Sequence, residues 1–239
     1  MKKIFAIMLA MMLVLCSAAM AEVMTHADYV AAELDSEVTI ETYVQDTQGW
    51  WNDNGQGKIS VYAQSEDGAY FIYELACEEA DAAKLVPGAK IRVTGYKGEW
   101  SGEVEIMDGT FEFVEGEAFI AEACDVTALL GSEELTAHMN EKVAFKGMTV
   151  EASKDAAGND VAFLYNWDGS GGKGNDLYFN VSVNGATYNF CVESYLCGAD
   201  TEVYQAVENL AIGDVIDMEG YLYWYNGANP HITAVTPAA

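Results

Sequence analysis

The residues best suited to bind a ligand are large aromatic side chains in segments rich in Gly and Asn. Such rings can stack on a flat ligand, and seven of them fall outside regular strand alternation. These candidate ligand-binding residues are Trp50, Trp51, Trp100, Trp167, Tyr223, Trp224 and Tyr225. The alternative is that these rings cover the ends of the domains or fill a contact between them, since Trp is usually largely buried.

Catalysis has little support in the sequence, and we predict no catalytic residue. None of the patterns G-x-S-x-G, H-E-x-x-H and C-x-x-C occurs. The chain has a single arginine, Arg92, which disfavours phosphate chemistry. Gly169–Gly174 fits G-x-G-x-x-G, but a strand-like run follows it where a dinucleotide site needs a helix. Abundant carboxylates leave a carboxylate-based hydrolase as a third hypothesis.

The sequence predicts no cofactor and no metal-ligating residue. Loops at 52–55, 155–160 and 168–176 are rich in Asn and Asp oxygens, which makes calcium the one ion to consider. None of these loops has EF-hand spacing, and ordinary turn chemistry explains their composition. Beyond residue 21, the cysteines are Cys77, Cys124, Cys191 and Cys197. They either form two disulfides or remain buried thiols, and their spacing is not that of a zinc site.

The first 21 residues have the organisation of a bacterial secretory signal peptide. Lys2 and Lys3 precede an apolar stretch, residues 4–15, and an A-x-A site ends at Ala21. We expect cleavage after Ala21 and a secreted protein, extracellular or periplasmic. No later apolar run reaches the ~20 residues that span a bilayer, so we expect no membrane insertion.

Charge is the strongest argument about partners. The chain has 11 Lys and Arg against 38 Asp and Glu, a formal charge of −27. Such a field repels phosphate, which predicts no nucleic-acid partner. The expected ligand is neutral or cationic: an extracellular glycan, a small molecule or a protein.

An internal repeat determines the predicted domain organisation. Residues 85–96 (LVPGAKIRVTGY) recur as 210–221 (LAIGDVIDMEGY) at an offset of 125, with matching Leu, Gly, Ile, Gly and Tyr. Near the start of each copy, 38–40 matches 143–145 at an offset of 105. The second copy is therefore about 20 residues longer. We predict domains at 22–117 and 132–239, joined by a linker at 118–131.

Each copy reads as three strands, a short helix and two strands. Copy one has expected strands at 37–46, 57–65, 69–76, 89–97 and 103–114, with a helix at 78–86. Copy two has them at 142–151, 160–166, 177–192, 214–223 and 230–235, with a helix at 200–210. Residues 177–192 can form a hairpin through Asn184-Gly185.

That order is the order of an OB-fold, a five-stranded Greek-key barrel. The L-x-x-G-x-x-I-x-V-x-G-Y segment resembles the helix-to-fourth-strand junction of exported bacterial OB-fold proteins. The predicted fold is all-β, with two tandem OB-like barrels. A β-sandwich is the alternative.

These inferences together predict a secreted, non-catalytic binding module that contacts its ligand through loop aromatics. The alternative is a structural or protein-interaction domain without a small ligand, in which the aromatics form an interface.

Overall fold

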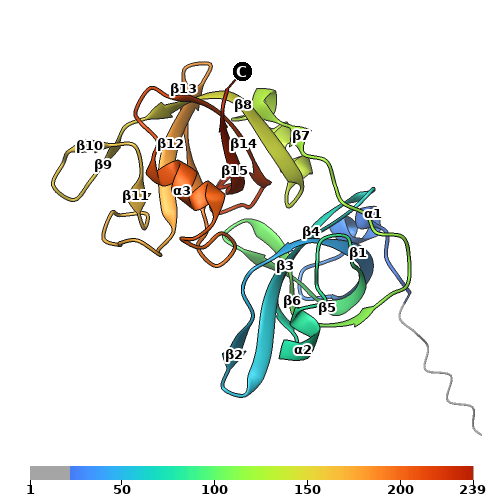
Figure 1. Ribbon diagram of the computed structural model, residues 1–239. Coiled ribbons are helices and arrows are strands. Elements are labelled where there is room, and N and C mark those ends of the chain that lie inside the picture. Colours follow the sequence, from blue (N-terminus) through green and yellow to red (C-terminus); the bar gives the residue numbers. More distant parts are fainter. Residues whose placement is uncertain (1–21, 239) are drawn as a thin grey trace, which may run out of the picture.

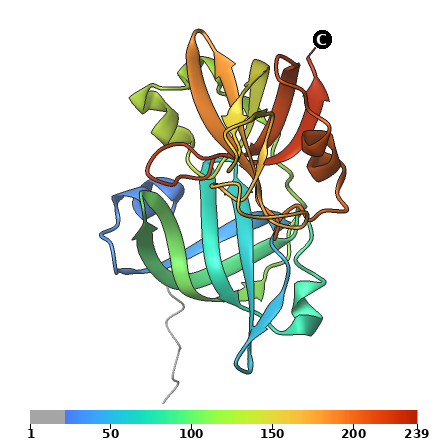
Figure 2. The same ribbon diagram turned by 90° about the vertical axis from the view of Figure 1, so that its left-hand side faces the viewer.

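Two closed β-barrels follow one another in the computed structural model, which describes residues 22–238 (Figure 1). Barrel 1 runs from β1 to β6 and barrel 2 from β8 to β15. The predicted signal peptide, residues 1–21, lies outside the described residues. Viewed after a quarter turn, barrel 2 stands above barrel 1 and the two are in contact (Figure 2).

Barrel 1 closes in the strand order β1-β3-β4-β6-β5-β1, and β4 and β6 are parallel. This is OB-fold topology. Helix α1 precedes the barrel and begins with a capping box, in which Thr25 and Asp28 bind each other's backbone N–H. The elements are α1 His26–Ala31, β1 Glu37–Thr47, β2 Trp51–Asp53, β3 Gln56–Ser65, β4 Gly68–Ala76, α2 Glu79–Ala82, β5 Lys90–Trp100 and β6 Glu103–Phe113.

Barrel 2 closes in the equivalent order, β8-β12-β13-β15-β14-β8, again with one parallel pair, β13 and β15. The prediction of two tandem OB-like barrels is confirmed, and the sandwich alternative is wrong. The elements are β7 Cys124–Asp125, η1 Thr127–Leu129, η2 Glu133–His138, β8 Lys142–Glu151, β9 Ser153–Lys154, β10 Asp160–Val161, β11 Leu164–Tyr165, β12 Leu177–Val183, β13 Ala186–Val192, α3 Glu202–Glu208, β14 Val215–Tyr221 and β15 His231–Pro237.

The repeat offset holds at the level of single residues. β5 begins at Lys90 and β14 at Val215, 125 positions later. Each strand bulges at its repeated glycine, Gly95 or Gly220. A Cβ on Gly95 would lie 2.7 Å from the Met107 carbonyl oxygen, and one on Gly220 would meet the His231 carbonyl. Both positions therefore require glycine for the close approach of backbone.

Two predicted elements of copy two differ in the structure. Residues 160–166, expected as strand two, contain only the short strands β10 and β11 within a long connection between β8 and β12. Asn, Asp and Gly flank the short apolar run 161–165 on both sides, and a bend at Ala162 divides it, so no long ladder forms. The predicted linker, 118–131, includes β7, which pairs in parallel with β8. The domain boundaries themselves stay a prediction.

Each barrel has its own hydrophobic core, with side chains such as Ile40 and Ile91 in barrel 1 and Phe145 and Phe179 in barrel 2. Cys77, Cys124, Cys191 and Cys197 are free thiols, so no disulfide links them. Among residues 22–238, no helix is long and apolar enough to cross a membrane.

Replacing Gly95 or Gly220 by Ala should destabilise the protein by about 1–3 kcal/mol, because the added methyl group clashes with backbone at the bulge. Gly172→Ala is the control, since a Cβ there meets nothing within 4 Å. Urea unfolding midpoints provide the measurement. Equal midpoints for Gly95→Ala and Gly172→Ala would contradict the packing argument.

Candidate functional site

A cleft of about 800 Å³ opens where the two barrels meet. Gln48, Phe71 and Tyr73 line it from barrel 1. Barrel 2 contributes residues on or beside its strands, one residue of the β8–β12 connection and several residues of the β14–β15 connection. Its lining residues are Trp167, Tyr178, Asn189, Glu193, Tyr223, Tyr225, Asn226, Gly227, Ala228, Asn229 and His231. We call this the inter-barrel cleft.

The strand residues of the cleft occupy outward-facing positions. On β4, Tyr70 and Ile72 point into the core of barrel 1, so Phe71 and Tyr73 point outward. On β12, Leu177 and Phe179 fill the core of barrel 2, which turns Tyr178 outward. β3–β4 and β12–β13 are the second and third OB strands of their barrels, and that face binds ligands in OB-folds. The cleft therefore combines the ligand face of both copies.

A buried aromatic seam forms the floor beside the cleft and joins the barrels. Tyr62 of β3 stacks on Tyr221 of β14, with ring centroids 4.6 Å apart. The Tyr62 hydroxyl is hydrogen-bonded to Nδ1 of His231 at 2.6 Å. Tyr223 stacks on His231 at 4.3 Å and meets Phe71 edge-on at 5.4 Å. This contact places Tyr223 at the boundary between the seam and the open cleft.

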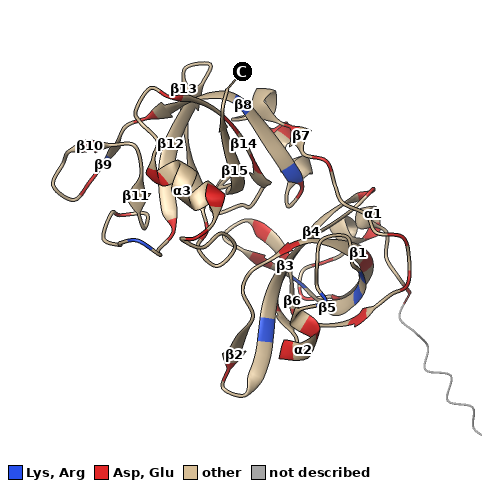
Figure 3. Cartoon of the chain, in the orientation of Figure 1, with Lys and Arg blue, Asp and Glu red and all other residues tan. Residues whose placement is uncertain are grey.

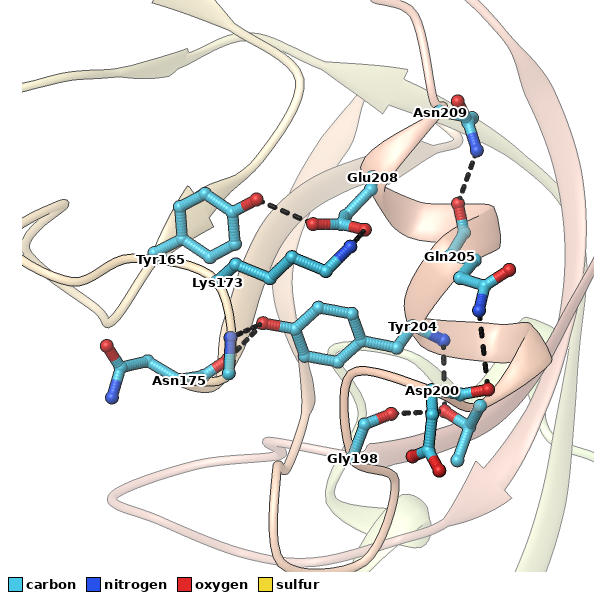
Figure 4. A network of polar contacts seen from close by, with 11 residues as sticks. Tyr165, Lys173, Asn175, Gly198, Asp200, Tyr204, Gln205, Glu208 and Asn209 are labelled. Atoms are coloured by element: carbon cyan, nitrogen blue, oxygen red, sulfur yellow. Dashed lines mark hydrogen bonds and ion pairs between the residues drawn. The ribbon is translucent and has the colours of Figure 1, made fainter.

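The long β8–β12 connection carries Trp167, and helix α3 anchors it (Figure 4). The Tyr204 hydroxyl donates to the Asn175 carbonyl at 2.7 Å and accepts the Gly174 N–H at 2.8 Å. Glu208 accepts hydrogen bonds from Lys173 and from the hydroxyl of Tyr165, at 2.6 and 2.7 Å. The loop is thus held at both sides of Trp167, whose side chain is 76% exposed.

The cleft is nearly free of charge, although the chain is strongly acidic. Figure 3 shows Asp and Glu distributed over both barrels. Among the cleft residues, Glu193 is the one carboxyl group. Burial, and to a lesser extent the nearby Asp176, raise the pKa of Glu193 to about 7. Hydrogen bonds donated by Tyr195 N–H, Leu196 N–H and the Gln48 side chain act in the opposite direction and lower it. Burial lowers the pKa of His231 to about 3, so this imidazole is neutral.

The structure brings together three of the seven predicted aromatics: Trp167, Tyr223 and Tyr225 line the cleft. The other four lie elsewhere. Trp50 packs against the core of barrel 1 and donates to the Cys77 carbonyl at 2.9 Å. Trp51, on β2, pairs with Lys58 of β3. Trp224 packs against the core of barrel 2. Trp100 is 60% exposed at the β5–β6 turn, outside the cleft.

Sequence reasoning missed Phe71, Tyr73 and Tyr178. Their signal was present in the expected strands at 69–76 and 177–192, where aromatic side chains occupy the alternate positions that normally face water. Alternation alone does not distinguish such rings from ordinary strand residues, because aromatic side chains are common in strands.

The oxygen-rich loops use their oxygens within the chain. Asp155 Oδ1 accepts the N–H groups of Ala157 and Asn159. Asp168 accepts the Ser170 N–H, and Asn52 accepts the Gly55 N–H. Within residues 22–238, no group of three or more His, Cys, Asp or Glu side chains could hold a metal ion. The expectation of no cofactor, with calcium as the one ion to consider, stays untested.

The chain is similar to several solved structures. No protein-family model and no curated protein sequence matches this chain. A murine DNA-binding protein bound to double-stranded DNA is 13% identical, with 84% of this chain and 96% of that chain covered and a TM-score of 0.40. The p204 HINb domain is 12% identical, with 86% and 100% covered and a TM-score of 0.38. A replication protein A heterotrimer bound to single-stranded DNA is 11% identical, with 82% and 50% covered and a TM-score of 0.30.

These comparisons correct two sequence-based expectations. The similar structures include proteins solved with double-stranded or single-stranded DNA. The sequence had instead predicted a glycan, a small molecule or a protein as the ligand, and no nucleic-acid partner. The error has a physical cause. Net charge describes the whole surface, whereas a binding site responds to nearby charges, and the cleft holds a single buried carboxyl group.

Tyr204→Phe should loosen the loop that carries Trp167, since it removes both hydrogen bonds of the hydroxyl. We expect a loss of about 1–2 kcal/mol in unfolding free energy and faster trypsin cleavage after Lys173. Tyr188→Phe is the matched control, because its hydroxyl binds the Leu130 carbonyl away from this loop. Unchanged cleavage in Tyr204→Phe would show that the hydroxyl does not hold the loop.

Proposed function

We propose that the protein binds single-stranded nucleic acid, with bases stacked in the inter-barrel cleft. The observation that carries this proposal is the set of accessible rings on the OB ligand face: Tyr73 is 41%, Tyr225 54% and Trp167 76% exposed. Aromatic stacking on bases is the usual sequence-tolerant contact of single-strand binding proteins, worth about 1–3 kcal/mol per base.

Polar groups beside these rings suit the edges of bases. Asn189, Asn226 and Asn229 line the cleft, and an amide side chain offers both donors and an acceptor. A duplex hides its base faces within the stack, so the rings favour unpaired bases. The proposed ligand is therefore a single strand in preference to a duplex.

The acidic surface weakens binding without excluding it. Charges separated by more than about 8 Å are largely screened at physiological ionic strength. Among residues 22–238, no Lys or Arg lines the cleft, so binding lacks the usual electrostatic contribution from phosphate contacts. We therefore expect weak association, with a dissociation constant of about 10–1,000 µM.

Tyr225→Ala and Trp167→Ala should each weaken binding by roughly 5- to 150-fold, the equivalent of one lost stacking contact. Trp100→Ala is the matched control, because this ring is exposed on the same molecule but outside the cleft. Fluorescence anisotropy with a labelled single strand of about 12 nucleotides, and with its duplex, provides the measurement.

Salt gives an independent test of the same proposal. Proteins that neutralise phosphates lose affinity steeply between about 50 and 200 mM salt. Binding by stacking in an acidic protein should stay constant or strengthen over that range. Absence of binding at ~1 mM protein, or equal loss in Trp100→Ala and Trp167→Ala, would refute the proposed function.

We also propose that the protein is an exported bacterial OB-fold protein, on the basis of the basic, apolar and A-x-A segments of residues 1–21. Expression of the full chain in a bacterium should yield a secreted or periplasmic product that begins at Glu22, as measured by N-terminal sequencing. A product retained in the cytoplasm with Met1 intact would contradict export.

A further inference from the structure

One ring nitrogen of His231 is available to a ligand in the inter-barrel cleft. His231 is the first residue of β15, lines the cleft and is 7% exposed. Its Nδ1 is hydrogen-bonded to the hydroxyl of Tyr62 at 2.6 Å. Within residues 22–238, Nε2 has no hydrogen-bond partner, and yet this atom is not fully buried. Nε2 is therefore an unpaired polar atom that opens to the cleft.

The imidazole ring is held from two sides, which fixes the direction of Nε2. Its face stacks on Tyr223, with ring centroids 4.3 Å apart and an interplanar angle of 19°. Its Nδ1 edge is bound by Tyr62, which is itself stacked on Tyr221 at 4.6 Å. A polar group whose side chain is locked by its neighbours binds a ligand without a further loss of rotamer freedom.

The Tyr62 hydroxyl determines which ring nitrogen carries a proton. Tyr62 is fully buried, and among the described residues Nδ1 of His231 is the one acceptor bonded to its hydroxyl. The Gln48 amide, whose Nε2 also donates to Glu193 at 3.2 Å, approaches the same hydroxyl as a donor. The hydroxyl proton therefore points to Nδ1, since a buried O–H without an acceptor is costly. A ring nitrogen that accepts a hydrogen bond carries no proton.

The single proton of the neutral imidazole then belongs to Nε2. Protonation of Nδ1 as well would force the Tyr62 hydroxyl to turn its proton away from the ring, where it has no acceptor among the described residues. Burial acts in the same direction, because it lowers the pKa of His231 to about 3. A neutral imidazole has one N–H, and the hydrogen bond at the other nitrogen decides where it lies. With Nδ1 as the acceptor, Nε2 is the donor.

We propose that His231 binds an uncharged hydrogen-bond acceptor on the edge of a base through its Nε2–H. This inference rests on the proposed function: Trp167 and Tyr225 stack on the faces of bases, and Nε2–H contacts an edge. The carbonyl oxygens and ring nitrogens of unpaired bases are such acceptors. A phosphate oxygen suits this donor less well, because the neutral ring supplies no positive charge and Glu193 lines the same cleft.

His231→Asn and His231→Gln form a matched pair, because each variant keeps one half of the hydrogen bonding of the imidazole. The amide nitrogen of Gln takes the place of Nε2, whereas the shorter Asn side chain reaches only the position of Nδ1. Both variants lose the ring that stacks on Tyr223. A difference in binding between the two is therefore due to the donor at the position of Nε2.

The probes are a labelled strand of about 12 thymidine nucleotides and the same strand with difluorotoluene in place of thymine. Difluorotoluene has the shape of thymine and stacks, but it lacks the carbonyl oxygens. Fluorescence anisotropy gives, for each protein, the ratio by which the thymidine strand binds more tightly. We expect this ratio to fall roughly 2- to 10-fold in His231→Asn, the equivalent of one hydrogen bond. In His231→Gln the ratio should stay close to that of wild type.

Nitrogen-15 NMR of the wild-type protein without ligand locates the proton directly, even if the variants fold poorly. The protonated and bare nitrogens of a neutral imidazole resonate far apart, so the spectrum identifies the tautomer. The chain has three histidines, and the ring of His231 is recognised by its NOE contacts with Tyr223. We expect the proton on Nε2 in wild type, and a mixture of both tautomers in Tyr62→Phe.

A wild-type His231 ring that carries its proton on Nδ1, or on both nitrogens near neutral pH, would overturn the inference. So would an unchanged ratio in His231→Asn while wild type binds the thymidine strand, an outcome that leaves the proposed function standing. Absence of binding by wild type to either strand refutes the proposed function itself, and the base contact with it. The two failures are therefore distinguished by whether wild type binds at all.

Discussion

Burial of the outward face of β3, β4 and β6 beneath barrel 2 is the constraint on which the rest of the structure depends. A closed barrel satisfies its own backbone hydrogen bonds and leaves no sheet edge to pair. The second barrel therefore attaches through side chains that face outward and through loop backbone, as in the hydrogen bond from Asn226 N–H to the Ser101 carbonyl. Tyr62, Phe71 and Tyr221 supply apolar area for this contact, and all are buried. The same contact also buries polar groups, which then need partners inside the protein.

Those buried polar groups give the interface an electrostatic character unlike the rest of the surface. Desolvation raises the pKa of Glu103 to about 8 and those of Glu105 and Glu193 to about 7. It lowers the pKa of His231 to about 3. All four groups therefore shift toward their neutral forms. A chain with a formal charge of −27 consequently holds a weakly charged cleft, because its ionised carboxylates lie mostly on exposed loops and strands.

The sequence predicted each barrel better than the relation between the barrels. Gly95 and Gly220 carry a local signal, because the bulge that needs them forms within one pair of strands. The cleft has no such local signal. Phe71 on β4 and Tyr178 on β12 line the same cleft only because the two barrels dock against each other. Trp50 shows the opposite case: its ring, which the sequence places in a loop, packs against the core of barrel 1.

The extra length of the second copy explains why the two ligand faces differ. Barrel 1 joins its first two long strands through residues 48–55, a short connection that includes β2, whereas barrel 2 uses residues 152–176. Both connections reach the cleft, the shorter one with Gln48 and the longer one with Trp167. Helix α3 holds the longer connection through Tyr204 and Glu208. Barrel 1 contributes strand residues that the seam partly covers. The different lengths of these two connections therefore make the cleft asymmetric, although the two barrels share one topology.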